Sequence, residues 1–406
     1  MLKYNPFKPG SIIHPGMFAG RNKELRLLET ALFQTKNGNP THFLIHGERG
    51  IGKSSLLMFL NYIASGDIPV EKNITYNFLT VSIELEPKDN YPEIIRKVAR
   101  DLQRQLDKNQ KLKKKLKNIW DFITNWEVLG VKYNRETIPP TAMLEELSDK
   151  FSEIAKSIVG DNDGIFLFID EADKAPSEAE LGEFAKAFTE RLTKRGAHNV
   201  GLGIVGISSV IKKMRKSHES SIRIFTPVQL SPLEQDERNQ VITLGLDEAE
   251  MKNGFRTLID DEALNLISLL SEGYPHFIQQ YSFSTFDHDT DNHINYIDVA
   301  DALTKKNGAL DQLGMKFFEN MYTEEICSDD YRTVLQVIAA HSPNYVSRKT
   351  IIEESELKRH TVDNALTALK KRGSVVRRSG QKGQYKLPSH SFATWIQAFK
   401  IANNVG

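Results

Sequence analysis

The stretch HFLIHGERGIGKSSLLMFLNYIA, His42–Ala64, decides the fold of this 406-residue chain. A short apolar run ends at His46, a turn with three glycines follows, and an apolar run with helical spacing begins after Ser54. The order of buried strand, glycine-rich turn and helix is typical of a parallel α/β sheet, in which strands alternate with helices.

The turn itself matches a phosphate-binding pattern. GERGIGKS, Gly47–Ser54, fits G-x-x-x-x-G-K-[S/T], in which successive backbone N–H groups and the N-terminus of the next helix surround phosphate oxygens. Lys53 is expected to reach the β- and γ-phosphates, and Ser54 to offer its hydroxyl to Mg²⁺. The alternative is a glycine-rich turn with an incidental lysine.

Further apolar runs rich in β-branched residues are separated by stretches with helical periodicity. They span Phe78–Ile83, Ile165–Ile169, Gly201–Ile207 and Ile224–Leu230. Runs of this kind are buried on both faces, so together with Thr41–His46 they predict a parallel α/β sheet covered by helices.

Two acidic residues, Asp170 and Glu171, directly follow the run Ile165–Ile169. They should lie at the carboxyl edge of the sheet, where ligands bind in open α/β folds. Asp170 is predicted to hold Mg²⁺ through water, and Glu171 to orient and deprotonate the water that attacks in phosphoryl transfer. Helix capping is the alternative role for such acids. The predicted nucleotide-binding set is Gly47, Glu48, Arg49, Gly50, Ile51, Gly52, Lys53, Ser54, Ser55 and Asp170.

Composition narrows the class of protein. Lys and Arg together number 53, as do Asp and Glu, so no net charge attracts nucleic acid or anionic lipid and any polyanion site must be local. The single cysteine, Cys327, excludes an intrachain disulfide and a cysteine-built zinc site. No apolar run approaches the ~20 residues that a membrane-spanning helix needs, so we expect a cytoplasmic protein with no membrane contact.

From Pro232 to about Asp329 the sequence has amphipathic helical patterns only. From about Asp329 short helices are followed by a β-hairpin. That order predicts a winged helix. We therefore expect an ATPase core at residues 1–231, a helical lid at 232–325 and a winged-helix domain at 326–406. A charged helical insertion is expected at about residues 92–145, and its lysine run is either a solvated helix face or a nucleic-acid or partner contact.

The window Tyr345–Lys386 holds eleven Lys or Arg against four acidic residues, in a chain with no net charge. Such a local excess predicts contacts with the backbone of duplex DNA. Winged helices also dock proteins, and this alternative stays open. The candidate DNA contacts, on the second helix and on the wing, are Arg359, Thr361, Asn364, Arg377, Arg378 and Lys382.

Several of these motifs, with FAGRNKEL at Phe18–Leu25 and EGYPHF around His276, together resemble the AAA+ ATPases related to origin-recognition and initiator proteins and to archaeal-type or signal-transduction (STAND) NTPases. The resemblance implies ATP as the nucleotide, with the adenine near FAGR. It also implies a five-stranded parallel sheet in which the strand Gly201–Ile207 lies between the strands that lead to Lys53 and to Asp170.

Further roles follow only from this resemblance. Ser208 or Ser209 falls where the family senses the γ-phosphate, although a helix cap is an equal alternative. Arg223, or else Arg215, falls where the family often carries an arginine finger for a neighbouring subunit, against the alternative of a surface arginine. His276 stands near the position of a nucleotide-sensing arginine in many members, which is a departure from the family pattern.

The sequence thus predicts an ATP-hydrolysing, Mg²⁺-dependent switch that associates with DNA through its C-terminal domain, in a possible homo-oligomer. A signalling or defence NTPase whose winged helix docks a protein effector is the main alternative. A chaperone-like remodeller is a third class, for which no pore-loop signature is found.

Overall fold

The computed structural model describes residues 3–12, 16, 18–70, 74–109, 112, 116, 139–378 and 380–404, without the side chains of 401–404. The chain divides into two compact units. The sheet unit is Ile12–Ser231, and the helical unit comprises Met1–Ser11 and Pro232–Gly406. Each unit is described by itself.

The sheet unit contains a five-stranded parallel sheet with the strand order β2-β3-β4-β1-β5. This confirms the predicted fold class and the position of β4 between β3 and β1. The elements are α1 (Asn22–Lys36), β1 (His42–His46), α2 (Lys53–Ser65), β2 (Phe78–Glu84), α3 (Tyr91–Lys108), α6 (Pro140–Ser157), β3 (Gly164–Asp170), η3 (Ser177–Ala179), α7 (Leu181–Lys194), β4 (Val200–Gly206), α8 (Ser209–Ser217), η4 (Ser221–Ile224) and β5 (Phe225–Gln229).

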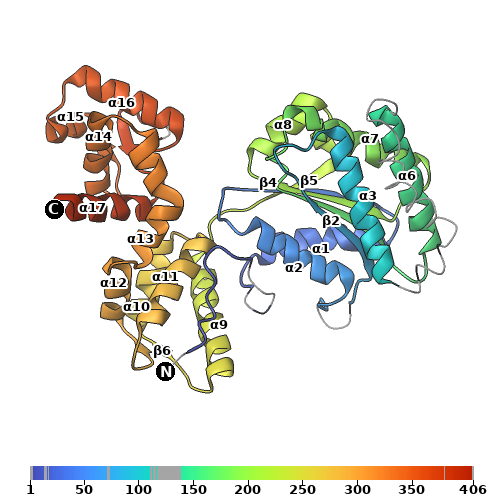
Figure 1. Cartoon of the computed structure of the whole chain (residues 1–406), viewed down its shortest axis with the longest axis horizontal. Coiled ribbons are helices and arrows are strands. Elements are labelled where there is room, and N and C mark those ends of the chain that lie inside the picture. Colours follow the sequence, from blue (N-terminus) through green and yellow to red (C-terminus); the bar gives the residue numbers. More distant parts are fainter. Residues whose placement is uncertain are drawn as a thin grey trace. The chain divides into compact units, whose positions relative to one another are not determined.

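Helices cover both faces of this sheet (Figure 1). On one face, alternate strand residues such as Ile165, Leu167 and Ile169 pack with buried side chains of α3, α6 and α7. On the other face, Phe166 and Phe168 point the opposite way, and α1 and α2 contact the strands. The period-2 alternation of a strand explains this division, because β3 is buried on both sides.

The face opposite α3 is filled by phenylalanine rings. Phe166 stacks on Phe43 with ring centroids 5.7 Å apart. The neighbouring strand β4 makes room for these rings with glycine: a Cβ at Gly201 would lie 2.2 Å from Phe166, and one at Gly203 would lie 2.4 Å from Phe43. Large side chains on β1 and β3 therefore fit against small ones on β4, which gives close packing without voids.

The charged insertion predicted at about residues 92–145 overlaps α3 and the start of α6, and both helices contribute to the core. Ile94, Ile95 and Val98 of α3 are fully buried. Their spacing gives the helix one apolar face. Among the charged residues of α3, Asp101 is also buried, and it accepts a hydrogen bond from the Ser82 N–H of β2. Of the predicted lysine run, Lys108 ends α3, and the other lysines lie outside the described residues.

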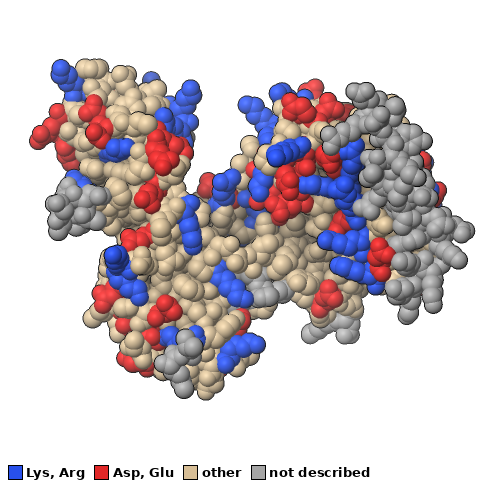
Figure 2. Space-filling view, viewed as in Figure 1, with Lys and Arg blue, Asp and Glu red and all other residues tan. Residues whose placement is uncertain are grey.

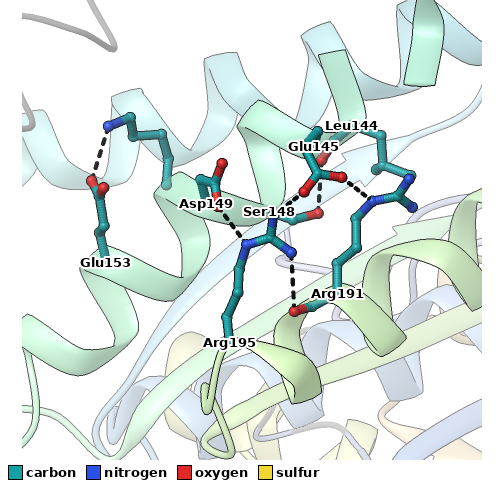
Figure 3. A network of polar contacts seen from close by, with 8 residues as sticks. Leu144, Glu145, Ser148, Asp149, Glu153, Arg191 and Arg195 are labelled. Carbon is teal, nitrogen blue, oxygen red and sulfur yellow. Dashed lines mark hydrogen bonds and ion pairs between the residues drawn. The ribbon is translucent and has the colours of Figure 1, made fainter. Parts of the chain in front are cut away.

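An ion-pair network joins α6 to α7 (Figure 3). Glu145 accepts hydrogen bonds from Arg191, at 2.6 Å, and from Arg195. Asp149 binds the same Arg195 guanidinium. The two arginines hold the pKa of Glu145 below its usual range. The network thus links the exposed sides of α6 and α7, whose other sides pack in the same buried core.

The helical unit carries two short sheets among its helices. Its two-residue strands β6 and β7 pair in parallel, and β8, β10 and β9 form an antiparallel sheet in that order. The elements are α9 (Gln235–Asn253), β6 (Leu258–Ile259), α10 (Asp261–Ser271), α11 (Pro275–His288), β7 (His293–Ile294), α12 (Tyr296–Thr304), α13 (Ala309–Leu313), the π-helical turns η5 (Gly314–Phe318) and η6 (Met321–Glu325), α14 (Asp329–Ala340), β8 (Val346–Ser347), α15 (Arg348–Ser355), α16 (Arg359–Arg372), β9 (Val376–Arg377), β10 (Gln384–Lys386) and α17 (His390–Asn404).

The N-terminal segment belongs to the helical unit. Phe7 is 2% exposed and lies against Gly245 of α9, where an added Cβ would come within 2.3 Å of the ring. Lys3 forms an ion pair with Asp289, and the backbone N–H of Lys8 donates to Gln279. The chain therefore passes between the two units twice, once after Ser11 and once after Ser231.

Charged residues of both signs are interspersed over the visible face (Figure 2), which fits the equal numbers of acidic and basic residues. Within the described ranges, no helix combines the length and the apolar character needed to cross a membrane.

Candidate nucleotide site

The phosphate-binding pattern forms a loop between the buried strand β1 and helix α2. β1 pairs with β4 on one side and with the edge strand β5 on the other, so the loop emerges at the carboxyl edge of the sheet, one strand in from its side. Gly50 and Gly52 adopt φ values of 78° and 95°, which residues with a Cβ rarely adopt. No side chain caps the N-terminus of α2. Its first N–H groups are therefore not bound by a cap side chain, and they can meet an anion.

The first glycine of the loop is required by packing. A Cβ at Gly47 would lie 2.9 Å from the Leu230 carbonyl oxygen and 3.2 Å from the Leu230 Cβ. Leu230 also donates its N–H to the carbonyl of His46 at 2.8 Å. The base of the loop thus lies directly against the residues that follow β5.

The Lys53 ammonium lies over the loop. It donates hydrogen bonds to the carbonyls of Glu48, at 2.8 Å, and of Gly47, at 3.3 Å. Burial lowers the pKa of Lys53, and the carboxylates of Asp173, Glu171 and Asp170 oppose that effect. Because burial disfavours the charged ammonium, a phosphate brought beside Lys53 would stabilise its positive charge.

Ser54 and Asp170, which are 116 positions apart in sequence, meet at this edge. The Ser54 hydroxyl lies near the Asp170 carboxylate and favours its ionised form, and the N–H of Glu171 donates to Asp170 Oδ1 at 2.7 Å. Burial nevertheless raises the pKa of Asp170. A hydroxyl and a carboxylate side by side are hard oxygen donors of the kind that Mg²⁺ takes, so these residues fit the predicted metal.

Glu171 follows the end of β3 in a left-handed backbone conformation, with φ of 52°. Such conformations in residues other than glycine are uncommon and concentrate at functional sites. Its carboxylate lies 3.4 Å from the Lys174 ammonium, which also contacts Glu84 at 3.3 Å. The side chain is about one third exposed, so solvent water reaches it.

Ser208 lies just beyond β4, next to α8. Its hydroxyl is 3.3 Å from Nδ1 of His46, the residue immediately before the loop. His46 is 8% exposed, and burial lowers its pKa, which favours the neutral ring. Of the two predicted sensing residues, Ser208 therefore contacts the end of β1, whereas Ser209 is the exposed first residue of α8.

Three further residues of this site carried no predicted role. They are His46, Asp173 and Lys213. Asp173 accepts a hydrogen bond from the Ile207 N–H at 2.8 Å, and Lys213 donates to the carbonyls of Asp173 and Ala175. Asp173 stands three positions after Asp170, and its place as the third acid in IDEAD is the one sequence signal that singles it out.

Within the loop, Glu48 and Arg49 are exposed, Ile51 is buried and Ser55 is partly buried on α2. The arginine-finger candidates Arg223 and Arg215 are exposed on η4 and α8. Among the described residues, neither of these two side chains forms a hydrogen bond or ion pair.

His276, near the family's arginine position, lies in the first turn of α11 in the helical unit. Burial, with a smaller contribution from Lys316, lowers its pKa to about 4, and its buried Nε2 has no hydrogen-bond partner among the described residues. It is therefore neutral at ordinary pH, unlike an arginine.

The candidate DNA contacts lie in the C-terminal part of the helical unit. Arg359 and Asn364 of α16 are exposed, and Thr361 is partly buried. Arg377 in β9, Arg378 and Lys382 are exposed on or beside the hairpin, with the Arg378 guanidinium 5.5 Å from the centre of the Tyr345 ring. Arg348 of α15 forms a bidentate ion pair with Asp363 of α16, in which Nε and Nη2 each lie 2.6 Å from a carboxylate oxygen.

A comparison with models of protein families finds one match. The model of the AAA ATPase domain family matches residues 17–192. No curated protein matches the sequence.

Solved structures match nearly the whole chain. The Aeropyrum pernix ORC2 protein, in ADPNP–ADP complexes, has a TM-score of 0.51 and 13% identity, covering 95% of this chain and 95% of that chain. CDC6P from Pyrobaculum aerophilum has a TM-score of 0.46 and 13% identity over 98% and 97% of the two chains. The Aeropyrum pernix ORC1 protein, in complex with DNA, has a TM-score of 0.44 and 14% identity over 96% and 95%. Residues 17–192 thus match the AAA ATPase domain family, and the chain has the fold of the Aeropyrum pernix ORC2 protein.

Proposed function

We propose that the chain is a Mg²⁺-dependent ATPase that works as a nucleotide-controlled switch on duplex DNA. The observation that carries the proposal is the nearness of the Ser54 hydroxyl, the Asp170 carboxylate and the Lys53 ammonium, each of which affects the charge of another. It brings the phosphate loop and the acidic end of β3 together at the carboxyl edge of a parallel sheet, where such folds bind ligands.

Each residue then has a defined task. Lys53 and the N–H groups of the loop bind the phosphates, and Ser54 with Asp170 would hold Mg²⁺, which supplies positive charge to the phosphate oxygens. Glu171 accepts a proton from the attacking water, and Ser208 contacts the terminal phosphate. ATP is the favoured nucleotide because residues 17–192 match the AAA ATPase domain and because ORC2, which shares the fold, was solved with ADPNP and ADP.

The nucleotide assignment is tested by binding of fluorescent ADP to full-length protein. Lys53→Ala removes the cation at the loop and should weaken binding strongly. Lys23→Ala removes an exposed lysine of α1 in the same unit and should bind as the wild type does. If Lys53→Ala binds nucleotide with unchanged affinity, the phosphate assignment is wrong.

DNA is proposed as the partner because exposed cations lie on α16 and also beside the hairpin. Cations on two elements of one small module can contact the phosphate backbone of a duplex. Helix-turn-helix proteins place the N-terminal residues of their second helix at base edges, which corresponds here to Arg359, Thr361 and Asn364. A protein effector docked on the same module is the alternative. Binding of duplex DNA by full-length protein with ATP and Mg²⁺ decides between them, because an effector-docking module predicts none even at low salt.

Association of copies of the chain belongs to the same proposal. Arg223, exposed and without a side-chain partner in the described part of the chain, is the first candidate to contact a nucleotide bound by a neighbouring copy. Arg223→Ala should then lower hydrolysis only under conditions in which copies associate, and an effect on the monomer would contradict this role.

A further inference from the structure

A buried arginine outside the phosphate loop holds the loop in place. Arg21, the last residue of FAGR, is 5% exposed. Its guanidinium donates one hydrogen bond to the carbonyl of Ile51, within the loop, at 3.0 Å, and another to the carbonyl of Ser231. Glu24, one turn along α1, lies 3.4 Å from the same guanidinium.

The backbone at Arg21 is shaped for this contact. Its φ is 63°, a left-handed conformation that a residue with a Cβ rarely adopts, and its carbonyl accepts the N–H of Leu25 at 2.8 Å to begin α1. An uncommon backbone conformation in a residue with a buried charge persists only where surrounding contacts enforce it.

The two carbonyls that Arg21 joins belong to segments that already touch. The Leu230 carbonyl lies against Gly47 so closely that no Cβ fits there, and the Leu230 N–H binds the carbonyl of His46. Ser231 is the last residue of the sheet unit, and Pro232 begins the helical unit. One end of the loop therefore packs on Leu230, and the other end is tied through Arg21 to the next residue, Ser231.

We propose that Arg21 is a positioning residue that couples the phosphate loop to the point where the chain leaves the sheet unit. A displacement of Ile51 when phosphates occupy the loop is passed through the guanidinium to Ser231, and so to the start of the helical unit. The role rests on the proposed nucleotide binding at Gly47–Ser54, which it extends by a route for regulation.

The chemistry of the side chain makes the claim specific. A planar guanidinium presents several N–H donors in fixed directions, so one group can bridge two carbonyls from different segments. A lysine ammonium keeps the charge but is a single point on a flexible stem. Arg21→Lys therefore keeps the buried charge and loses the bridge.

The first experiment compares hydrogen exchange of full-length, nucleotide-free wild type, Arg21→Lys and Arg26→Lys, in which an exposed arginine of α1 is changed. In Arg21→Lys, the amides of the loop and of residues 229–233 should exchange about tenfold faster, as expected for loss of about one hydrogen bond. Exchange in α3 and β3 should not change, and Arg26→Lys should match the wild type. An equal increase in exchange throughout the sheet unit would show only a loss of overall stability and would overturn the proposal. Unchanged exchange in Arg21→Lys would also overturn it.

The second experiment tests the coupling itself. Saturating ADP should slow exchange both in the loop and at residues 229–233 of the wild type, whereas in Arg21→Lys the protection should stay confined to the loop. Protection of residues 229–233 to the same degree in both proteins would contradict the proposal. If ADP does not bind the wild type, the proposed nucleotide function fails, and the nucleotide-free comparison still tests the bridge.

Discussion

The Ser54 hydroxyl lies near the Asp170 carboxylate and favours its ionised form, although the two residues are 116 positions apart and belong to different elements. The parallel sheet, with β4 between β3 and β1, brings the end of β3 and the start of α2 to the same edge. The contact places both proposed metal-holding oxygens beside the loop.

Changing Asp170 to Asn should raise the Mg²⁺ concentration at which nucleotide binding is half complete. The carboxylate holds the ion through water in our account, and loss of such an outer partner typically lowers metal affinity by ~10- to 100-fold. Titration of Mg²⁺ at fixed ATP, read by nucleotide fluorescence, measures the change. An unchanged Mg²⁺ midpoint would remove Asp170 from the metal site.

Replacing Gly203 by Ala should destabilise the sheet unit. The new methyl group would lie 2.4 Å from the Phe43 ring and 3.1 Å from Phe168, so the packed rings must move, at a cost of about 1–3 kcal/mol. Gly16→Ala is the control, because a Cβ there meets no atom within 4 Å. Urea unfolding followed by circular dichroism compares them, and equal midpoints would contradict the packing described for this face.

Acid should destabilise the protein through His42. Burial lowers the pKa of His42 to about 4, and its Nδ1 accepts the Leu202 N–H at 3.1 Å. The unfolded chain binds the proton near the ordinary value of about 6.5, so this group's contribution is complete above that pH and is lost as pH falls from 6.5 towards 4. The loss is about 1.4 kcal/mol per pH unit for one group.

His42→Asn keeps an acceptor for the Leu202 N–H and removes the titration. Its free energy of unfolding should therefore fall less steeply than that of the wild type between pH 6.5 and 4. The same slope in both proteins would mean that His42 titrates normally in the folded state.

The strands and the phosphate loop were predictable from sequence because their signals are local. Runs such as Ile165–Ile169 are apolar at every position, and the spacing of Gly47, Gly52 and Lys53 is fixed by the loop that they build. α3 was harder to interpret, because its many charges on the outer face hide an apolar face that only its helical geometry separates.

Contacts between distant segments carry no such signal. Nothing in the sequence around Phe7 indicates that its ring packs against Gly245, 238 positions later. In the same way, FAGR indicated a nucleotide-contacting segment, but the partners of Arg21 are backbone carbonyls, whose identity no residue type reveals. The role of His46 depends on its distance to Ser208, which the order of residues does not contain.

Removal of Arg377 and Arg378 together, by change to Ala, should weaken DNA binding across all sequences. Each lost phosphate contact should make the salt dependence shallower, by about 0.9 log units in affinity per tenfold change in salt. The double variant Lys252→Ala, Lys306→Ala removes two exposed lysines elsewhere in the helical unit and should bind normally. An unaltered salt slope in the arginine variant would exclude the hairpin from the DNA interface.

Hydrolysis of ATP by Glu171→Gln tests the central claim most directly. The change keeps the size of the side chain and removes the proton acceptor, so the rate should fall by about 10² to 10⁴ while the dissociation constant for ATP stays the same. Glu178→Gln, on the exposed turn η3, is the control and should hydrolyse ATP as the wild type does. Wild-type hydrolysis at the background rate in the presence of ATP, Mg²⁺ and duplex DNA, or an equal rate in Glu171→Gln, would contradict the account.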